Sequence, residues 1–165
     1  MANFFALVLI GGLVGLVIII TQPELRARVA AAAVPLGGLV AVGATLGSLY
    51  FSEIADFPPC KLCWFQRIAM YPLAILLPLA YLRRDDIMQF YAAVLASVGL
   101  MISLYHIQLQ LFPDQSSFCE VTSPCTNSPV KAFDVFTIPH MAAASFVLII
   151  GVSVLALRQP PEEGS

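Results

Sequence analysis

Charge is what this sequence has least of. Asp, Glu, Lys and Arg together make up 11% of its 165 residues, whereas hydrophobic residues make up 59%. The mean hydropathy is +0.89, which excludes an ordinary soluble domain. The formal net charge is −2 and no block of basic residues occurs, so nothing indicates nucleic-acid binding. A chain of this length has room for about one domain.

The few charges separate five long apolar segments. A helix needs about 20 apolar residues to cross the hydrocarbon core of a bilayer. Helices also satisfy their own backbone polar groups, which irregular backbone facing lipid cannot do. The composition therefore predicts an all-α integral membrane protein with five spans. The expected spans are Asn3–Ile20, Val29–Phe51, Ile68–Leu82 extended by Trp64 and Phe65, Ile87–Phe112 and Val135–Leu157.

Lys and Arg are distributed unequally between the two sides of this arrangement. Five of the eight lie after the first, third or fifth span, at Arg26, Arg28, Arg83, Arg84 and Arg158. Cytoplasmic loops carry the excess of Lys and Arg, so these three regions are expected to be cytoplasmic. No Lys or Arg precedes the first apolar segment, so we interpret it as a true span and not as a cleaved signal peptide.

The four cysteines form two close pairs. Cys60 and Cys63 make a C-x-x-C at the start of the third span, and Cys119 and Cys125 lie in the following loop on the same side. This side is predicted to be extracytoplasmic, where disulfides are permitted. Thiol–disulfide exchange requires a thiolate to reach a disulfide sulfur. Two dithiols on one membrane face therefore indicate electron relay.

Two ionisable residues lie close to the first pair. Arg67 follows Cys63 by four residues, so both side chains can share one helical face and the guanidinium would favour the Cys63 thiolate. His106 is expected at the depth of the first turns of the third span. An intramembrane ionisable residue is a functional hypothesis by default. The alternatives are an interfacial anchor for Arg67 and a hydrogen-bonded packing residue for His106.

Two non-catalytic interpretations of the cysteines compete with electron relay. Four cysteines including a C-x-x-C could bind zinc, although the five residues between Cys119 and Cys125 are more than ligand spacing favours. The pairs could also be structural disulfides, although short closed loops gain least from a cross-link. We expect no metal site.

The motifs around both pairs resemble those of the disulfide bond formation protein B (DsbB) family, in its shorter BdbC-like branch. The similarity covers about Val34 to Leu157. It rests on Pro59-Cys60-Lys61-Leu62-Cys63-Trp64-Phe65-Gln66-Arg67, Met70-Tyr71-Pro72-Leu73, Tyr105-His106, Gln110-Leu111-Phe112-Pro113, the second cysteine pair and Ile138-Pro139.

The resemblance implies a thiol:quinone oxidoreductase in the bacterial inner (plasma) membrane. Such a protein reoxidises a thioredoxin-like, DsbA-type thiol oxidase outside the cytoplasm and passes electrons to a membrane quinone, ubiquinone or menaquinone. By the same resemblance, the partner attacks Cys119, whose mate is Cys125, and Cys60 exchanges with that pair. Cys63 faces the quinone as the charge-transfer thiolate, with Arg67 and His106 near the quinone ring.

The expected organisation is a four-helix redox domain over residues 29–158, preceded by an additional transmembrane helix and cytoplasmic turn over 1–28. A polar tail occupies 159–165. Gln66 stands where many members of the family have Glu. A protein similar to vitamin K epoxide reductase is the alternative enzyme. It is disfavoured because its loop pair precedes the C-x-x-C, whereas here the C-x-x-C comes first.

Overall fold

The structure is a computed structural model, and it describes residues 2–22, 24, 32–83, 85–112, 125, 131–132 and 136–158. Its elements are α1 (Ala2–Thr21), α3 (Ala33–Leu49), the π-helix η1 (Tyr50–Ile54), α4 (Lys61–Arg83), α5 (Asp86–Leu111), β1 (Lys131–Ala132), β2 (Phe136–Thr137) and α6 (Ile138–Leu157). The two short strands pair antiparallel immediately before α6.

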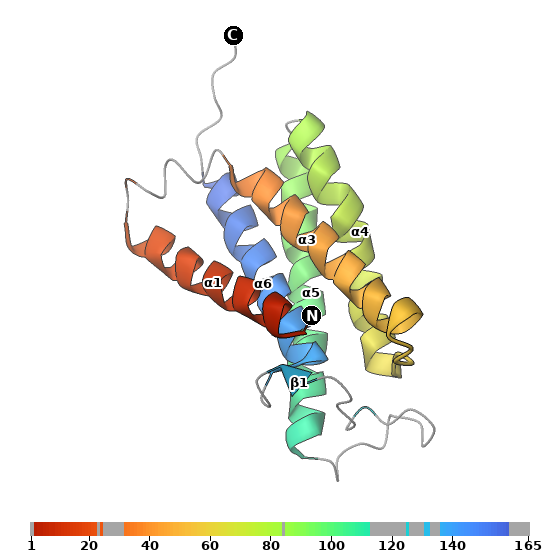
Figure 1. Ribbon diagram of the computed structural model, residues 1–165. Coiled ribbons are helices and arrows are strands. Elements are labelled where there is room, and N and C mark those ends of the chain that lie inside the picture. Colours follow the sequence, from red (N-terminus) through yellow and green to blue (C-terminus); the bar gives the residue numbers. More distant parts are fainter. Residues whose placement is uncertain are drawn as a thin grey trace.

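The helices confirm the predicted membrane architecture. Among the residues that the structure describes, four apolar helices are long enough to cross a membrane, namely Val34–Ile54, Lys61–Arg83, Ile87–Leu111 and Ile138–Leu157. A shorter apolar stretch, Ala6–Thr21, belongs to α1. In Figure 1, α3, α4, α5 and α6 form one bundle and α1 lies on its outside, along α6. The chain is therefore a multi-pass membrane protein with a four-helix bundle and an additional N-terminal helix.

The bundle core is built from small and branched side chains that let the four helices approach closely. Gly99 of α5 lies so near Phe146 of α6 that a Cβ atom at this position would overlap the aromatic ring. Phe146 is fully buried. The buried residues at the centre of the bundle are Ala41, Ala69, Met70, Leu73, Leu77, Ala92, Ala96, Phe146 and Ile149.

A separate apolar cluster attaches α1 to the bundle. Leu16 packs with Leu148, Val152 and Leu155 of α6. Gly151 gives Leu16 the space to approach, because a Cβ atom there would lie 2.6 Å from a Leu16 methyl group. The additional helix therefore contacts α6, whereas the cysteine pairs belong to the start of α4 and to the segment between α5 and α6.

Side-chain chemistry fixes the start of α5 at the opposite end from the cysteines. The Asp85 carboxylate accepts hydrogen bonds from the backbone N–H groups of Ile87 at 2.9 Å and Met88 at 3.3 Å. An Asp at this position satisfies amides that the first turn leaves unpaired. The turn after α4 is thereby kept short, so α5 returns antiparallel to α4 and brings His106 back to the cysteine end.

Candidate active site

Cys60 is the residue immediately before α4, and it caps that helix. Its carbonyl accepts from the Trp64 amide at 3.1 Å, and its Sγ accepts from the Cys63 amide at 3.4 Å. This is the arrangement that a serine oxygen makes at a helix N-cap, with sulfur in place of oxygen. The Sγ atoms of Cys60 and Cys63 lie 2.9 Å apart, and both residues are free cysteines.

The surroundings of Cys60 favour its thiolate. Its pKa falls from an ordinary 9.0 to about 4, chiefly because the Cys63 thiol hydrogen-bonds to its sulfur. Burial opposes this change, and His106 and the Cys63 amide add to it. The positive end of α4 acts in the same direction. The donors around the reduced pair thus converge on Cys60, while the assignment of Cys63 as the charge-transfer thiolate stays a prediction.

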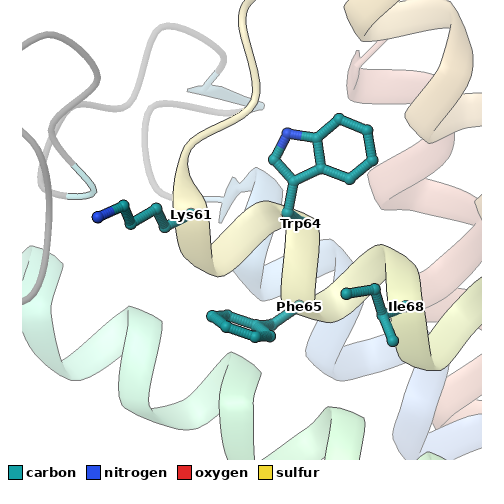
Figure 2. Close-up of a pocket in the computed structure, with 4 residues that line it drawn as sticks. All are labelled: Lys61, Trp64, Phe65 and Ile68. Atoms are coloured by element: carbon teal, nitrogen blue, oxygen red, sulfur yellow. The ribbon is translucent and has the colours of Figure 1, made fainter.

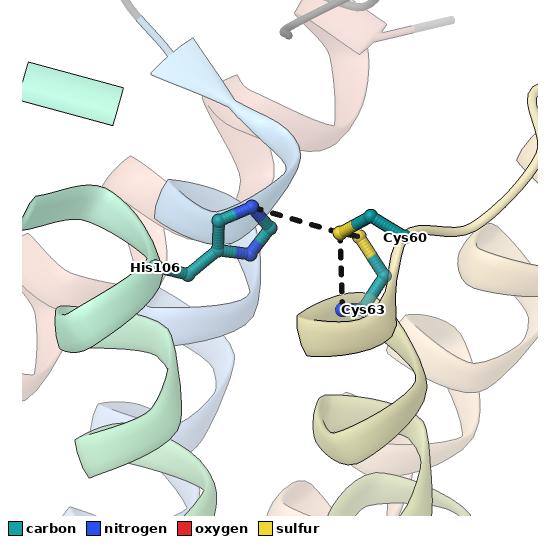
Figure 3. Close-up of side chains that lie close together, drawn as sticks. All are labelled: Cys60, Cys63 and His106. Carbon is teal, nitrogen blue, oxygen red and sulfur yellow. Dashed lines mark hydrogen bonds between the residues drawn. The ribbon is translucent and has the colours of Figure 1, made fainter. Parts of the chain in front are cut away.

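His106 reaches Cys60 from α5, as Figure 3 shows. Its Nε2 lies 3.8 Å from Cys60 Sγ and 3.0 Å from the carbonyl oxygen of Cys125. Its Nδ1 lies 3.3 Å from the Gln66 amide nitrogen. The predicted depth of His106 is confirmed, because the ring lies level with the first turns of α4. Gln66 was not singled out as a site residue from the sequence.

The second pair meets the first through Cys125. Cys125 is disulfide-bonded and only 1% exposed. It belongs to one buried cluster with Cys60, Leu62 and Leu109. The expectation that the two pairs meet is therefore confirmed for Cys60 and Cys125. Cys119 lies outside the described residues.

Arg67 is buried inside the bundle. Its Nε donates to Ser48 Oγ and its Nη2 donates to the Ser48 carbonyl, each at 3.0 Å. The guanidinium carbon also lies 5.3 Å from the centre of the Trp64 ring, a cation–π geometry. Arg67 is 8% exposed. This burial and these hydrogen bonds favour a role inside the bundle over the interfacial-anchor interpretation.

Sequence reasoning missed Ser48 because its importance depends on a backbone irregularity. Ser48 lies just before the π-helix η1, where hydrogen bonds of the i→i+5 type widen the helix. The Ser48 carbonyl also accepts from Ser52 Oγ at 3.4 Å. A carbonyl at such a junction can accept hydrogen bonds from side chains, and here it accepts one from Arg67. No propensity in this apolar helix indicates a π turn.

A second histidine fastens the start of α6 to the end of α5. Thr137 Oγ1 donates to Gln110 Oε1 at 2.8 Å and lies 2.7 Å from His140 Nδ1. Because the hydroxyl proton goes to Gln110, Nδ1 of His140 supplies the proton of the second bond. This link lies beside β2 and positions the end of the loop that carries the second cysteine pair.

The first pair and His106 could also be considered as metal ligands, because their three ligand atoms lie within 4.8 Å of one another. Two sulfurs on a tetrahedral zinc ion would be about 3.8 Å apart, given Zn–S bonds of about 2.3 Å. Here the two sulfurs are 2.9 Å apart. The His106 nitrogen nearest to them also hydrogen-bonds the Cys125 carbonyl. The geometry thus favours a dithiol paired with an imidazole over a metal centre.

An open apolar cavity of about 540 Å³ lies on the outer side of the first turns of α4. Lys61, Trp64, Phe65 and Ile68 line it, as Figure 2 shows. Helical spacing places these residues on the side of α4 that faces away from Cys63 and Gln66. Trp64 is common to the cavity and to the Arg67 contact. The cavity is therefore adjacent to the cysteine site but separate from it.

Taken together, the four-helix bundle and the free dithiol beside a disulfide-bonded cysteine define a membrane protein built for disulfide exchange. Comparison with known proteins gives the family: residues 30–157 match the family described as "Disulfide bond formation protein DsbB". The chain belongs to the DsbB family. Membership implies an oxidoreductase with a role in disulfide bond formation, and it excludes the vitamin K epoxide reductase-like alternative.

Individual relatives agree with this membership. "Probable disulfide formation protein C" of Halalkalibacterium halodurans is 43% identical over 124 residues, covering 73% of this chain and 90% of the relative. "Disulfide bond formation protein C" of Bacillus subtilis is 43% identical over 114 residues, covering 68% and 83%. The "SPbeta prophage-derived disulfide bond formation protein B" of the same species is 40% identical over 111 residues, covering 67% and 75%. No solved structure matches the chain.

Proposed function

We propose that this protein is a thiol:quinone oxidoreductase of the bacterial plasma membrane. It would reoxidise an extracytoplasmic, thioredoxin-like DsbA-type thiol oxidase and pass the electrons to ubiquinone or menaquinone. The observation that carries the proposal is the meeting of Cys60, Cys125 and His106 at one end of the bundle. The distribution of Lys and Arg supports an extracytoplasmic location for this end.

The proposed electron path is a series of disulfide exchanges. A thiolate of the partner attacks Cys119, and Cys125 leaves with the electron pair. The Cys125 thiolate then attacks Cys60 in an oxidised first pair, and Cys63 leaves as the thiolate. In each exchange one S–S bond forms as another breaks. Resolution of the two mixed disulfides leaves the partner oxidised, the second pair oxidised and the first pair reduced.

The residues beside Cys63 fit a quinone as the acceptor. Arg67 uses two of its N–H groups on Ser48, and a guanidinium has five, so donors remain for a carbonyl oxygen. Trp64, whose ring lies over the Arg67 guanidinium, offers an aromatic face beside these donors. A bound quinone would accept two electrons from the reduced first pair, one proton from its remaining thiol and a second proton from water.

Anaerobic mixing of the purified protein with a reduced thioredoxin-like oxidase and a quinone tests this function directly. Ultraviolet absorbance should show quinol formed in a one-to-one ratio with partner disulfide, and ubiquinone and menaquinone are tried separately. Cys63→Ser is the matched control, because it should stop quinone reduction while leaving one round of partner oxidation by the second pair. Partner oxidation without quinol from either quinone would refute quinone as the acceptor.

A further inference from the structure

The hydrogen bonds of His106 determine which ring nitrogen carries the proton. A carbonyl oxygen can only accept, so the 3.0 Å contact with Cys125 requires a proton on Nε2. In the neutral ring Nδ1 is then an acceptor, and its partner at 3.3 Å must be the Gln66 amide NH₂ group. The two contacts agree with each other and specify the Nε2–H tautomer.

The nitrogen that carries this proton is the one nearest to Cys60. Nε2 lies 3.8 Å from Cys60 Sγ, within the reach of an N–H donor to sulfur. His106 is 1% exposed and Gln66 is 5% exposed, so water does not compete strongly for either side chain. The opposite tautomer would direct a lone pair at both the Cys125 carbonyl and the Cys60 sulfur. By donating to Nδ1, Gln66 therefore disfavours this opposite tautomer, in which the ring would repel the Cys125 carbonyl and the Cys60 sulfur.

We propose that Gln66 is a positioning residue that holds His106 in the Nε2–H tautomer, so that the ring stabilises the Cys60 sulfur as it leaves during exchange between the two cysteine pairs. The proposal deepens the function proposed above and rests on the same electron path. It concerns the step between the two pairs and does not involve the quinone. Gln66 acts only through His106.

The step at issue resolves the mixed disulfide that joins Cys60 to the second pair. The other second-loop thiolate attacks the second-loop sulfur of this bond, a new disulfide forms within the second pair, and the Cys60 bond breaks. Negative charge moves from the attacking sulfur to Cys60, and no outside oxidant is required. The Nε2–H group of His106 donates to the sulfur on which the charge arrives, and its proton stays on the ring.

The test compares two buried glutamines. Gln66→Met keeps the length of the side chain but removes the donor to His106. Gln89→Met is the matched control: Gln89 is 2% exposed in α5 at the other end of the bundle, and its amide atoms have no hydrogen-bond partner among the described residues. All variants are made in the full-length protein, purified without quinone.

Two measurements are made on each variant. ¹⁵N chemical shifts of the histidine ring, assigned with His106→Asn, report which nitrogen carries the proton. Rapid acid quench after one equivalent of dithiothreitol, followed by alkylation and mass spectrometry, reports how fast thiols leave the second pair and appear at Cys60 and Cys63. We expect Gln66→Met to mix the tautomers. This variant should slow exchange about tenfold, the effect of one lost hydrogen bond.

The outcomes separate this inference from the proposed function. A wild-type tautomer or a wild-type exchange rate in Gln66→Met would overturn the positioning role. An equal slowing in Gln89→Met would also overturn it, because the effect would then come from general loosening of the bundle. Failure of the wild-type protein to reduce a quinone would refute the proposed function, while the ring shifts and the exchange between pairs would still decide the role of Gln66.

Discussion

The reduction potential of the first cysteine pair should depend on pH with half of the slope of an ordinary dithiol. Reduction of a disulfide to two thiols takes up two protons, which lowers the potential by about 59 mV per pH unit. Because the Cys60 pKa is about 4 in place of 9.0, the reduced pair holds one thiol and one thiolate above that pH. Only one proton is then taken up, and the slope falls to about 30 mV per pH unit.

The sign and size of the effect follow from the same values. The Cys60 thiolate stabilises the reduced pair at pH values above about 4, and this stabilisation is lost as the pH falls through that value. At pH 7, roughly three units higher, the pair should be more oxidising than an unperturbed dithiol by about 90 mV. A more oxidising first pair draws electrons more strongly from the second pair.

The assay is equilibration of the first pair with glutathione redox buffers between pH 3 and 8, followed by acid quench and alkylation. A variant with Cys119→Ser and Cys125→Ser isolates the first pair. His106→Phe removes one donor to Cys60, and the 3.8 Å contact is long, so the bend in the curve should move up by only about one pH unit. A slope of 59 mV per unit up to pH 8 in the parent protein would refute the Cys60 thiolate.

Three further predictions concern the quinone, the fold and the partner. Arg67→Met should raise the KM for quinone about tenfold or more with folding preserved. Arg67→Lys should restore only part of the quinone affinity, because a compact ammonium lacks the planar fork of the guanidinium. Unchanged quinone kinetics in both variants would leave Arg67 with a purely structural role. Gly99→Ala should destabilise the bundle by roughly 1–3 kcal/mol in denaturant titration because its methyl group overlaps an aromatic ring of α6, whereas Gly11→Ala, with open space around it, should not. Cys125→Ser should accumulate a mixed disulfide between Cys119 and the thioredoxin-like partner on a non-reducing gel, and trapping through the first pair would reverse this assignment.

The sequence predicted those features that depend on hydrophobicity and chain reversal. The apolar segments gave the spans to within a few residues, and the short turn at Asp85 ensured that His106 returns to the level of Cys60. The side of each helix that faces its neighbours could not be predicted, because these helices are apolar all round. The Arg67–Ser48 contact depends on which sides of α3 and α4 face each other. The Gln66–His106 contact depends in the same way on which sides of α4 and α5 face each other.

The capping role of Cys60 could be predicted from the sequence only in part. Its place before α4 could be predicted from the two prolines that precede it and from the start of the apolar run. That its sulfur accepts the Cys63 amide depends on the rotamer, which the sequence does not determine. The sequence also does not determine which of the two sulfurs carries the negative charge. The structure favours the thiolate at Cys60. The position of Arg67 in the sequence had instead indicated Cys63.

The π turn after α3 sets the phase of the loop that delivers the first cysteine pair. Each residue of an α-helix advances the chain by about 100° around the axis, so a turn closed one residue later rotates everything after it by about that angle. The chain then leaves through Ala55 and Asp56, and Asp56 has a positive φ of 57° just before the two prolines. Loss of one residue from Tyr50–Ile54 would change the composition and hydropathy of the chain very little, but it would change the direction in which the loop leaves the helix. The number of residues in this helix end therefore helps to determine where the first cysteine pair lies.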